Sequence, residues 1–178
     1  MKIETRIPLL EEILDERKTE IGGDFAGYKN HVYRMINFCF AQAADFSREE
    51  REKIIIAGCF HDIGIWTGAT FDYLAPSIAS AREYLSRGNR EKWIPEIALM
   101  IDLHHKLGKN HDNRLTEVFR KGDLVDFSLG LVKCGVPKDY VKSVKKQFPN
   151  AGFHKRLVKL AGGWICRHPL NPIPVLKW

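Results

Sequence analysis

The apolar and polar positions of the first half of the chain follow the spacing of helices. From about residue 25 to residue 44 the chain has no proline and repeats apolar side chains on one helical face: Val32, Met35, Ile36, Cys39 and Phe40. Ser47 and Glu50 then form an S-x-x-E capping box in front of the apolar run 54–60. Three consecutive isoleucines alone would favour a strand, but the capping box indicates a buried helix.

Further helical segments follow in the middle of the chain. Pro76 and Ser77 are expected to open a helix that Gly88 ends in a left-handed cap. Apolar residues at helical spacing continue over 95–106 and again over 116–131. The loop between these two segments is marked by Gly108, Asn110 and Asn113.

The last part of the chain predicts two more helices and a non-helical tail. A short helix is expected between Pro137 and Pro149, and Asn150 offers an N-cap for the next one. Three prolines within 169–174 exclude a helix there. About six to eight helices and no convincing strand pair therefore predict an all-α fold.

Composition and length indicate one soluble, globular domain spanning 1–178, in which helices within 137–168 pack on the preceding core. The 28 Lys and Arg against 22 Asp and Glu give a net charge of +6, which favours anionic small molecules such as nucleotides or phosphorylated metabolites. A solvated basic surface explains the same charge equally well. Nucleic acid is an unlikely partner, because the basic stretch 133–146 lacks interleaved aromatic residues.

Cysteine usage and the N-terminal residues favour a cytoplasmic location. Cys39, Cys59, Cys134 and Cys166 have no C-x-x-C spacing and are expected to be reduced core residues. Residues 1–14 mix charged with apolar side chains and lack the apolar core of a signal peptide. No apolar run approaches the roughly 18 residues that a membrane span needs. The oligomeric state is left open.

Ionisable residues occur where the pattern predicts burial, and they form the candidate site. His61 and Asp62 close the apolar run 54–60, His31 lies within the preceding helix, and Asp123 lies within a later one. Buried charge is costly unless it is paired or bound to a metal. Each residue alone is more simply a hydrogen-bonded core histidine or a helix-capping aspartate. The ordered set is better explained as the ligands of a divalent cation.

The ligand types limit the metal and suggest its chemistry. Without thiolates, the set suits Mn²⁺, Fe, Co²⁺, Ni²⁺, Zn²⁺ or Mg²⁺. Because side chains of His61 and Asp62 diverge by about 100° on a regular helix, a shared ion must lie over the helix end, near Gly64. Such a cation activates water and polarises phosphoryl oxygens. With a basic surface, this points to hydrolysis of a phosphate ester.

These residues resemble the H…HD…D signature of the HD superfamily of metal-dependent phosphohydrolases. The resemblance covers roughly residues 25–130 and includes an H-x-x-R element from His31 to Arg34, an H-D-I-G segment from His61, and a D-x-x-D stretch from Asp123. It implies an all-helical bundle of the HD type and phosphomonoesterase or phosphodiesterase activity on nucleotide-like substrates.

The resemblance also assigns roles to individual residues. His31, His61, Asp62 and Asp123 would be the metal ligands, and Asp126 is the rival of Asp123 for the last position. Arg34 would lie near the phosphate or hold a ligand in place, and together with Lys106 it would offset negative charge developing during catalysis. Asp62 would bridge to a second ion or accept a proton from the attacking water.

Two departures from the family pattern bear on the substrate and on the number of ions. Ile65 stands where family members that dephosphorylate deoxynucleoside monophosphates carry an acidic residue. One ion is expected, and a second is an alternative, since histidines lie between the HD pair and Asp123: His104, His105 and His111. His105 best matches the family spacing, and His104 and His105 cannot both point inward on a regular helix.

Several other residues and functions remain open. Tyr73 and its neighbours lie where they can line a pocket. A basic rim is conceivable from Lys106, Lys109, Arg114, Arg120 and Lys121, although solvated helix faces are the commoner fate of such charges. The pair Arg167 and His168 is expected to pack at the C-terminus. The alternative functions are hydration of a small nitrile such as cyanamide, di-iron oxidative cleavage, and non-catalytic nucleotide binding.

Overall fold

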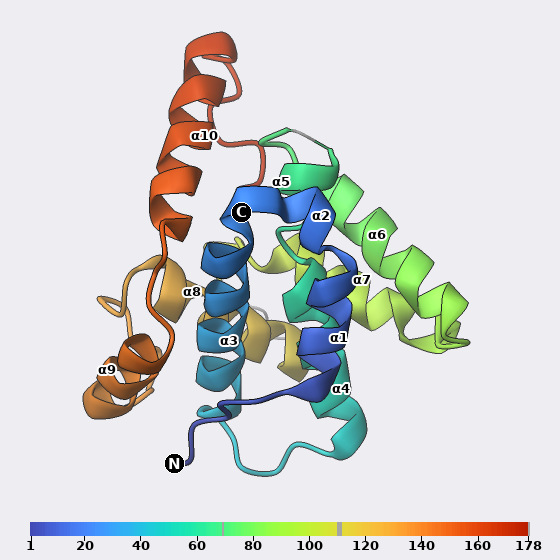
Figure 1. Ribbon diagram of the computed structural model, residues 1–178, viewed down its shortest axis with the longest axis vertical. Coiled ribbons are helices and arrows are strands. Elements are labelled where there is room, and N and C mark those ends of the chain that lie inside the picture. Colours follow the sequence, from blue (N-terminus) through green and yellow to red (C-terminus); the bar gives the residue numbers. More distant parts are fainter. Residues whose placement is uncertain (69, 110–111, 178) are drawn as a thin grey trace.

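The computed structural model describes residues 1–68, 70–109 and 112–177, and within these ranges the chain is a single all-α body (Figure 1). The longer helices are α1 (Pro8–Glu16), α3 (Phe25–Phe40), α4 (Arg48–Phe60), α6 (Leu74–Arg87), α7 (Ile94–Leu103), α8 (Arg114–Phe127), α9 (Lys138–Gln147) and α10 (Phe153–Arg167). Shorter turns of helix are α2 (Lys18–Ile21), η1 (Gly22–Asp24), α5 (Gly64–Thr67) and η2 (Glu91–Trp93). No strand occurs in the described ranges, where only an isolated bridge joins Lys106 to Lys177.

Helix α4 begins with the predicted capping box. The Ser47 hydroxyl accepts a hydrogen bond from the Glu50 N–H at 3.1 Å, and the Glu50 carboxylate accepts one from the Ser47 N–H at 2.8 Å. The isoleucines of this helix are buried, which confirms the helical interpretation over the strand alternative. The helix therefore carries its apolar run directly up to His61.

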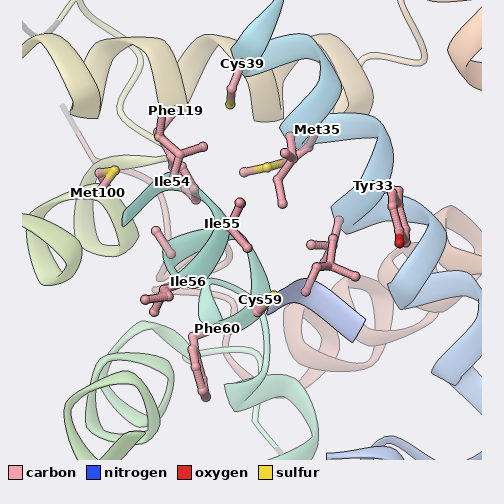
Figure 2. Close-up of a cluster of buried hydrophobic side chains, with 14 of the residues drawn as sticks. Tyr33, Met35, Cys39, Ile54, Ile55, Ile56, Cys59, Phe60, Met100 and Phe119 are labelled. Atoms are coloured by element: carbon pink, nitrogen blue, oxygen red, sulfur yellow. The ribbon is translucent and has the colours of Figure 1, made fainter. Parts of the chain in front are cut away.

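The core lies between α3, α4, α7 and α8, whose side chains point into one cluster (Figure 2). Helix α3 packs against both α4 and α8, and α7 closes the core by packing on α4, α6 and α8. Gly122 permits a close approach of α8 to α3, because a Cβ atom at this position would lie 3.0 Å from the Met35 carbonyl oxygen and would overlap the Cys39 sulfur. The three helices that carry His31, His61 and Asp123 are thus held together at the centre.

The boundaries of two predicted helices need correction. Helix α3 ends at Phe40 rather than near residue 44. Helix α6 begins at Leu74, so Pro76 lies inside its first turn, where a missing N–H costs nothing. Gly88 does not form a left-handed cap, since its φ is −91°; the next residue, Asn89, takes the left-handed conformation with φ of 53°.

The later helices are also shifted relative to the prediction. The Asn113 side chain caps α8 by accepting a hydrogen bond from the Thr116 N–H at 2.8 Å, so the helix starts at Arg114. It stops at Phe127 because Leu129 has a φ of 55°. Gly152, not Asn150, occupies the N-cap position of α10, with a φ of 89°.

Other expectations for the second half hold. Helix α9 lies between the two prolines as predicted, and the described tail after α10 contains no helix. Within the described ranges, no helix is both long enough and apolar enough to cross a bilayer. The four cysteines are free; Cys39 and Cys59 are buried as predicted, whereas Cys134 is half-buried and Cys166 is exposed.

Candidate metal centre

His31 lies in the middle of α3 and is held by a buried carboxylate behind it. Its Nδ1 is 2.7 Å from Asp126 Oδ2, and the Arg34 Nε and Nη2 atoms donate to the same carboxylate at 2.5 and 2.8 Å. Burial would raise the pKa of Asp126, but the hydrogen bonds from His31 and Arg34 lower it, so Asp126 stays ionised. Asp126 therefore orients the ring through Nδ1, and Nε2 is the nitrogen that faces His61.

Two further histidines are oriented in the same way by backbone carbonyls. His61 directly follows α4, and its Nδ1 donates to the Gly58 carbonyl at 2.8 Å. His104 directly follows α7, and its Nδ1 donates to the Ile101 carbonyl at 2.6 Å. Because a carbonyl only accepts, these bonds fix the proton on Nδ1 in both rings and leave Nε2 available as a ligand.

The Nε2 atoms of His31 and His61 converge with two carboxylates. These nitrogens are 3.0 Å apart, and Asp62 Oδ2 lies 3.4 Å from His61 Nε2 and 3.6 Å from His31 Nε2. Asp123 Oδ1, from α8, lies 3.6 Å from each nitrogen. Atoms bound to one ion at about 2.0–2.2 Å lie roughly 3.0–3.6 Å from one another. His31, His61 and Asp123 thus fit a single divalent cation, and Asp62 Oδ2 lies beside the same two nitrogens.

The other oxygen of Asp62 faces a second group of donors. Asp62 Oδ1 lies 3.6 Å from His104 Nε2, and among the described residues neither atom has a hydrogen-bond partner. Buried polar atoms without partners are rare in folded proteins and call for an explanation such as an ion. His104, His105 and Asp123 also bring ligand atoms within 4.8 Å of one another. The residues therefore fit a second cation beside the first, with Asp62 between them.

The electrostatics of the cluster favour added positive charge. Burial alone would lower the pKa of His61, but the carboxylates of Asp62 and Asp123 outweigh it and raise the pKa to about 9. Conversely, burial would raise the pKa of Asp123, and hydrogen bonding to His61 with the nearby imidazoles lowers it to about 2. His61, Asp62 and Asp123 are each at most 4% exposed, so solvent does little to balance the two carboxylates.

His104 is the site residue that sequence reasoning passed over in favour of His105. The expectation that only one of them points inward assumed a regular helix over 95–106, whereas α7 ends at Leu103. Beyond that point both rings reach the cluster, and His105 Nε2 lies 2.8 Å from the Tyr73 hydroxyl. Burial and the neighbouring His104 lower the pKa of His105 to about 3, which keeps it neutral. His111 lies outside the described residues.

The two basic residues expected to assist catalysis lie differently. All the described contacts of Arg34 are behind the cluster, since its Nη1 also donates to the carbonyls of Phe148 and Pro149 at 3.1 Å. This favours the second of its two predicted roles, holding a ligand in place. The carbonyl of Lys106 accepts a hydrogen bond from Arg120, and no contact joins its ammonium group to the cluster among the described residues. Its catalytic role stays a prediction.

The remaining candidates have other partners. Arg114 pairs with Asp45 and Glu50, whereas Arg120 and Lys121 pair with Glu117, and the basic rim stays a prediction. Ile65 is buried in an apolar cluster, which leaves no carboxylate at that position. Arg167 and His168 are exposed at the end of α10, where the His168 ring stacks on Trp164.

A cavity of about 330 Å³ opens onto the cluster. His31, Asp62, His105 and Asp123 line one end of it, and Tyr73 lines it as the sequence suggested. Side chains of α10 and of the C-terminal tail also line the cavity. Donor atoms of the cluster are therefore accessible to a small molecule.

Comparison of the chain with protein-family models, with curated proteins and with solved structures gives no match.

Proposed function

We propose that the chain is a metal-dependent hydrolase that cleaves a phosphate ester in a small molecule. The observation that carries this proposal is the convergence of three fixed imidazole Nε2 atoms and two carboxylates at the end of a cavity. The H…HD…D resemblance to the HD phosphohydrolases supports the same reaction class. The expectation of a nucleotide-like substrate rests on that resemblance and on the net charge of +6.

Some of these residues would bind the metal, and others would orient its ligands. His31, His61, Asp62 and Asp123 would hold a divalent cation, and His104 with His105 would complete a second position. When bound, such a cation activates water and polarises a phosphoryl oxygen. Asp62 Oδ1, which has no hydrogen-bond partner among the described residues, would bind a second ion or, with one ion bound, accept a proton from the attacking water. Asp126 and Arg34 keep the His31 ring aligned.

Elemental analysis of purified wild type and of Asp62→Asn tests the metal site directly. We expect about one to two equivalents of a transition metal in wild type and a loss of at least tenfold in Asp62→Asn, because the carboxylate faces both ligand groups. Asp139→Asn, which alters an exposed carboxylate on α9, is the control and should retain its metal. Retention of full metal by Asp62→Asn would contradict the assignment.

The reaction class is then tested with the metal found. Phosphomonoesters and phosphodiesters should be hydrolysed by wild type and by Asp139→Asn, and Asp62→Asn should lose at least 10²-fold in kcat. Release of inorganic phosphate or of the alcohol is the measurement. Metal binding without turnover of any ester would leave the centre in place and overturn the hydrolase proposal.

A further inference from the structure

The cavity beside the metal centre is polar only at the end where the ligands lie. Its remaining walls are apolar, formed chiefly by Phe71, Phe127, Leu157, Ala161, Ile165 and Val175. Leu157, Ala161 and Ile165 recur every four residues, so they share one face of α10. The helix thus presents a continuous apolar surface to the space above the ligands.

No Lys or Arg lines this cavity among the residues that the structure describes. Two cations near it are paired with carboxylates elsewhere: Lys177 with Asp102 and Arg156 with Asp24, each at 3.1 Å. Additional phosphate groups or the polar edges of a base would therefore be buried here without partners, which is costly. This wall suits a ligand body without charges or many polar atoms.

Part of the apolar wall of the cavity is exposed to solvent. Val158, Ile165 and Ile173 are 72, 42 and 46% exposed, although all three line the cavity. A ligand lying against them would bury part of this surface and gain about 25 cal/mol for each Å² removed from water. The volume of about 330 Å³ is at the low end of the range for small-molecule pockets.

We infer that the substrate carries a single reacting group at the metal centre and an uncharged apolar body, alkyl or aryl, that lies against α10 and the tail. This inference rests on the proposed function and specifies its substrate class. Helix α10 and the tail then determine specificity, and the centre supplies the chemistry. A mononucleotide, with a polar base and sugar, fits this wall less well than a hydrocarbon group of similar size.

Binding of n-alkyl phosphonates, which cannot be hydrolysed at the phosphorus–carbon bond, tests the inference without turnover. Calorimetric titration of the metal-loaded protein with ethyl to octyl phosphonate should show binding that tightens by about fourfold for each methylene buried. The heat-capacity change should become more negative along the series. The same titration with phenyl phosphonate measures whether an aryl group binds as tightly as an alkyl group.

Two variants on α10 localise the effect. Ala161→Phe places a large side chain in the cavity. The increase in binding affinity from ethyl to octyl phosphonate should therefore be at least tenfold smaller than in wild type. Lys159→Phe adds the same ring to an exposed position of the same helix and should bind like wild type. Equal chain-length dependence in wild type and Ala161→Phe would overturn the placement of the apolar body.

Turnover separates failure of this inference from failure of the proposed function. If alkyl phosphates are hydrolysed with kcat/KM independent of chain length, and nucleoside monophosphates are hydrolysed faster, the phosphohydrolase proposal stands and the inference fails. If no ester is hydrolysed but phosphonate binding still depends on chain length and on Ala161, the pocket is confirmed and the hydrolase proposal fails.

Discussion

At the scale of single residues, the position of His31 depends on two groups that do not line the cavity. Asp126 accepts from the His31 Nδ1–H, and Arg34 holds Asp126 through two hydrogen bonds. All three residues are at most 2% exposed. Carboxylates behind a ligating histidine fix its tautomer and raise its basicity. Asp126 is therefore a positioning residue.

Replacing Asp126 by Asn should weaken metal binding and destabilise the fold. We expect metal affinity to fall by about 10–100-fold, since Asn no longer orients His31 as a carboxylate does. The free energy of unfolding should fall by about 3–5 kcal/mol, because Arg34 is left buried without a counter-charge. Competition with a chromophoric chelator and urea denaturation measure the two effects. Unchanged affinity would contradict the positioning role.

The chelator-treated protein should lose stability at alkaline pH through His61. Its pKa of about 9 in the folded protein exceeds the value of about 6.5 expected in the unfolded chain. The folded state therefore holds the proton more tightly, so this stabilisation is complete below about pH 6.5 and is lost as the pH rises through about 9. Urea denaturation in chelator at about pH 6 and about pH 9.5 measures the loss. His61→Gln should show a smaller decrease between these pH values, and an equal decrease would exclude His61 as its source.

The residues that sequence reasoning found are those fixed by spacing and local context. His31, His61, Asp62 and Asp123 could be proposed together because each lies within or at the end of an apolar helical segment. Sequence reasoning preferred Asp123 to Asp126, which lies one turn further along α8. The contacts of Asp126 with Arg34 and His31 place it behind the cluster. His105 was preferred to His104 because the end of α7 at Leu103, which depends on packing, could not be predicted.

At the scale of helices, the site depends on how closely α3 and α8 approach. Gly122 precedes Asp123 and faces the Met35 carbonyl and the Cys39 side chain of α3. Burial of these groups leaves little room for adjustment. The separation of the two helices therefore sets the distance between His31 and Asp123.

Gly122→Ala should push α8 away from α3. We expect a loss of about 1–3 kcal/mol in unfolding free energy from overpacking, together with weaker metal binding because Asp123 moves with the helix. Gly162→Ala is the control: nothing lies within 4 Å of a Cβ there, so alanine should stabilise α10 by about 0.5–1 kcal/mol. Urea denaturation and chelator competition compare the two variants, and equal stability would show that the contact does not limit packing.

The local pattern of apolar residues predicted most of the long helices, but it did not predict where they end. The capping box at Ser47 is encoded by neighbouring residues and was predicted correctly. Left-handed residues at Asn89 and Leu129 end α6 and α8, and their side chains do not require that conformation. Helix α1 was missed, although Leu10, Ile13 and Leu14 have helical spacing after Pro8 and pack on the core.

At the scale of the whole molecule, metal should act as a stabilising ligand of the fold. The donors come from α3, α8 and the ends of α4 and α7, so they converge only when the core is assembled. A ligand that binds only the native state stabilises by about 2.7 kcal/mol at a free concentration of 100 times Kd. For a chain of 178 residues this corresponds to a rise in Tm of roughly 5–10 °C.

Scanning calorimetry over a series of metal concentrations measures this rise. The Tm of wild type should increase with the logarithm of free metal, and that of His61→Asn should not. Addition of chelator should return wild type to its starting Tm. A Tm that is independent of metal concentration would mean that the cluster is not a native-state binding site.

The metal cluster and the apolar wall of the cavity come from different parts of the chain. The ligands lie between His31 and Asp123 in the packed core, whereas much of the wall lies on α10 and the tail, whose side chains are largely half-buried or exposed. Substitutions in residues 157–176 can therefore reshape the cavity with little effect on the core. During evolution, single tolerated substitutions in this wall can therefore change the substrate while the reaction stays the same.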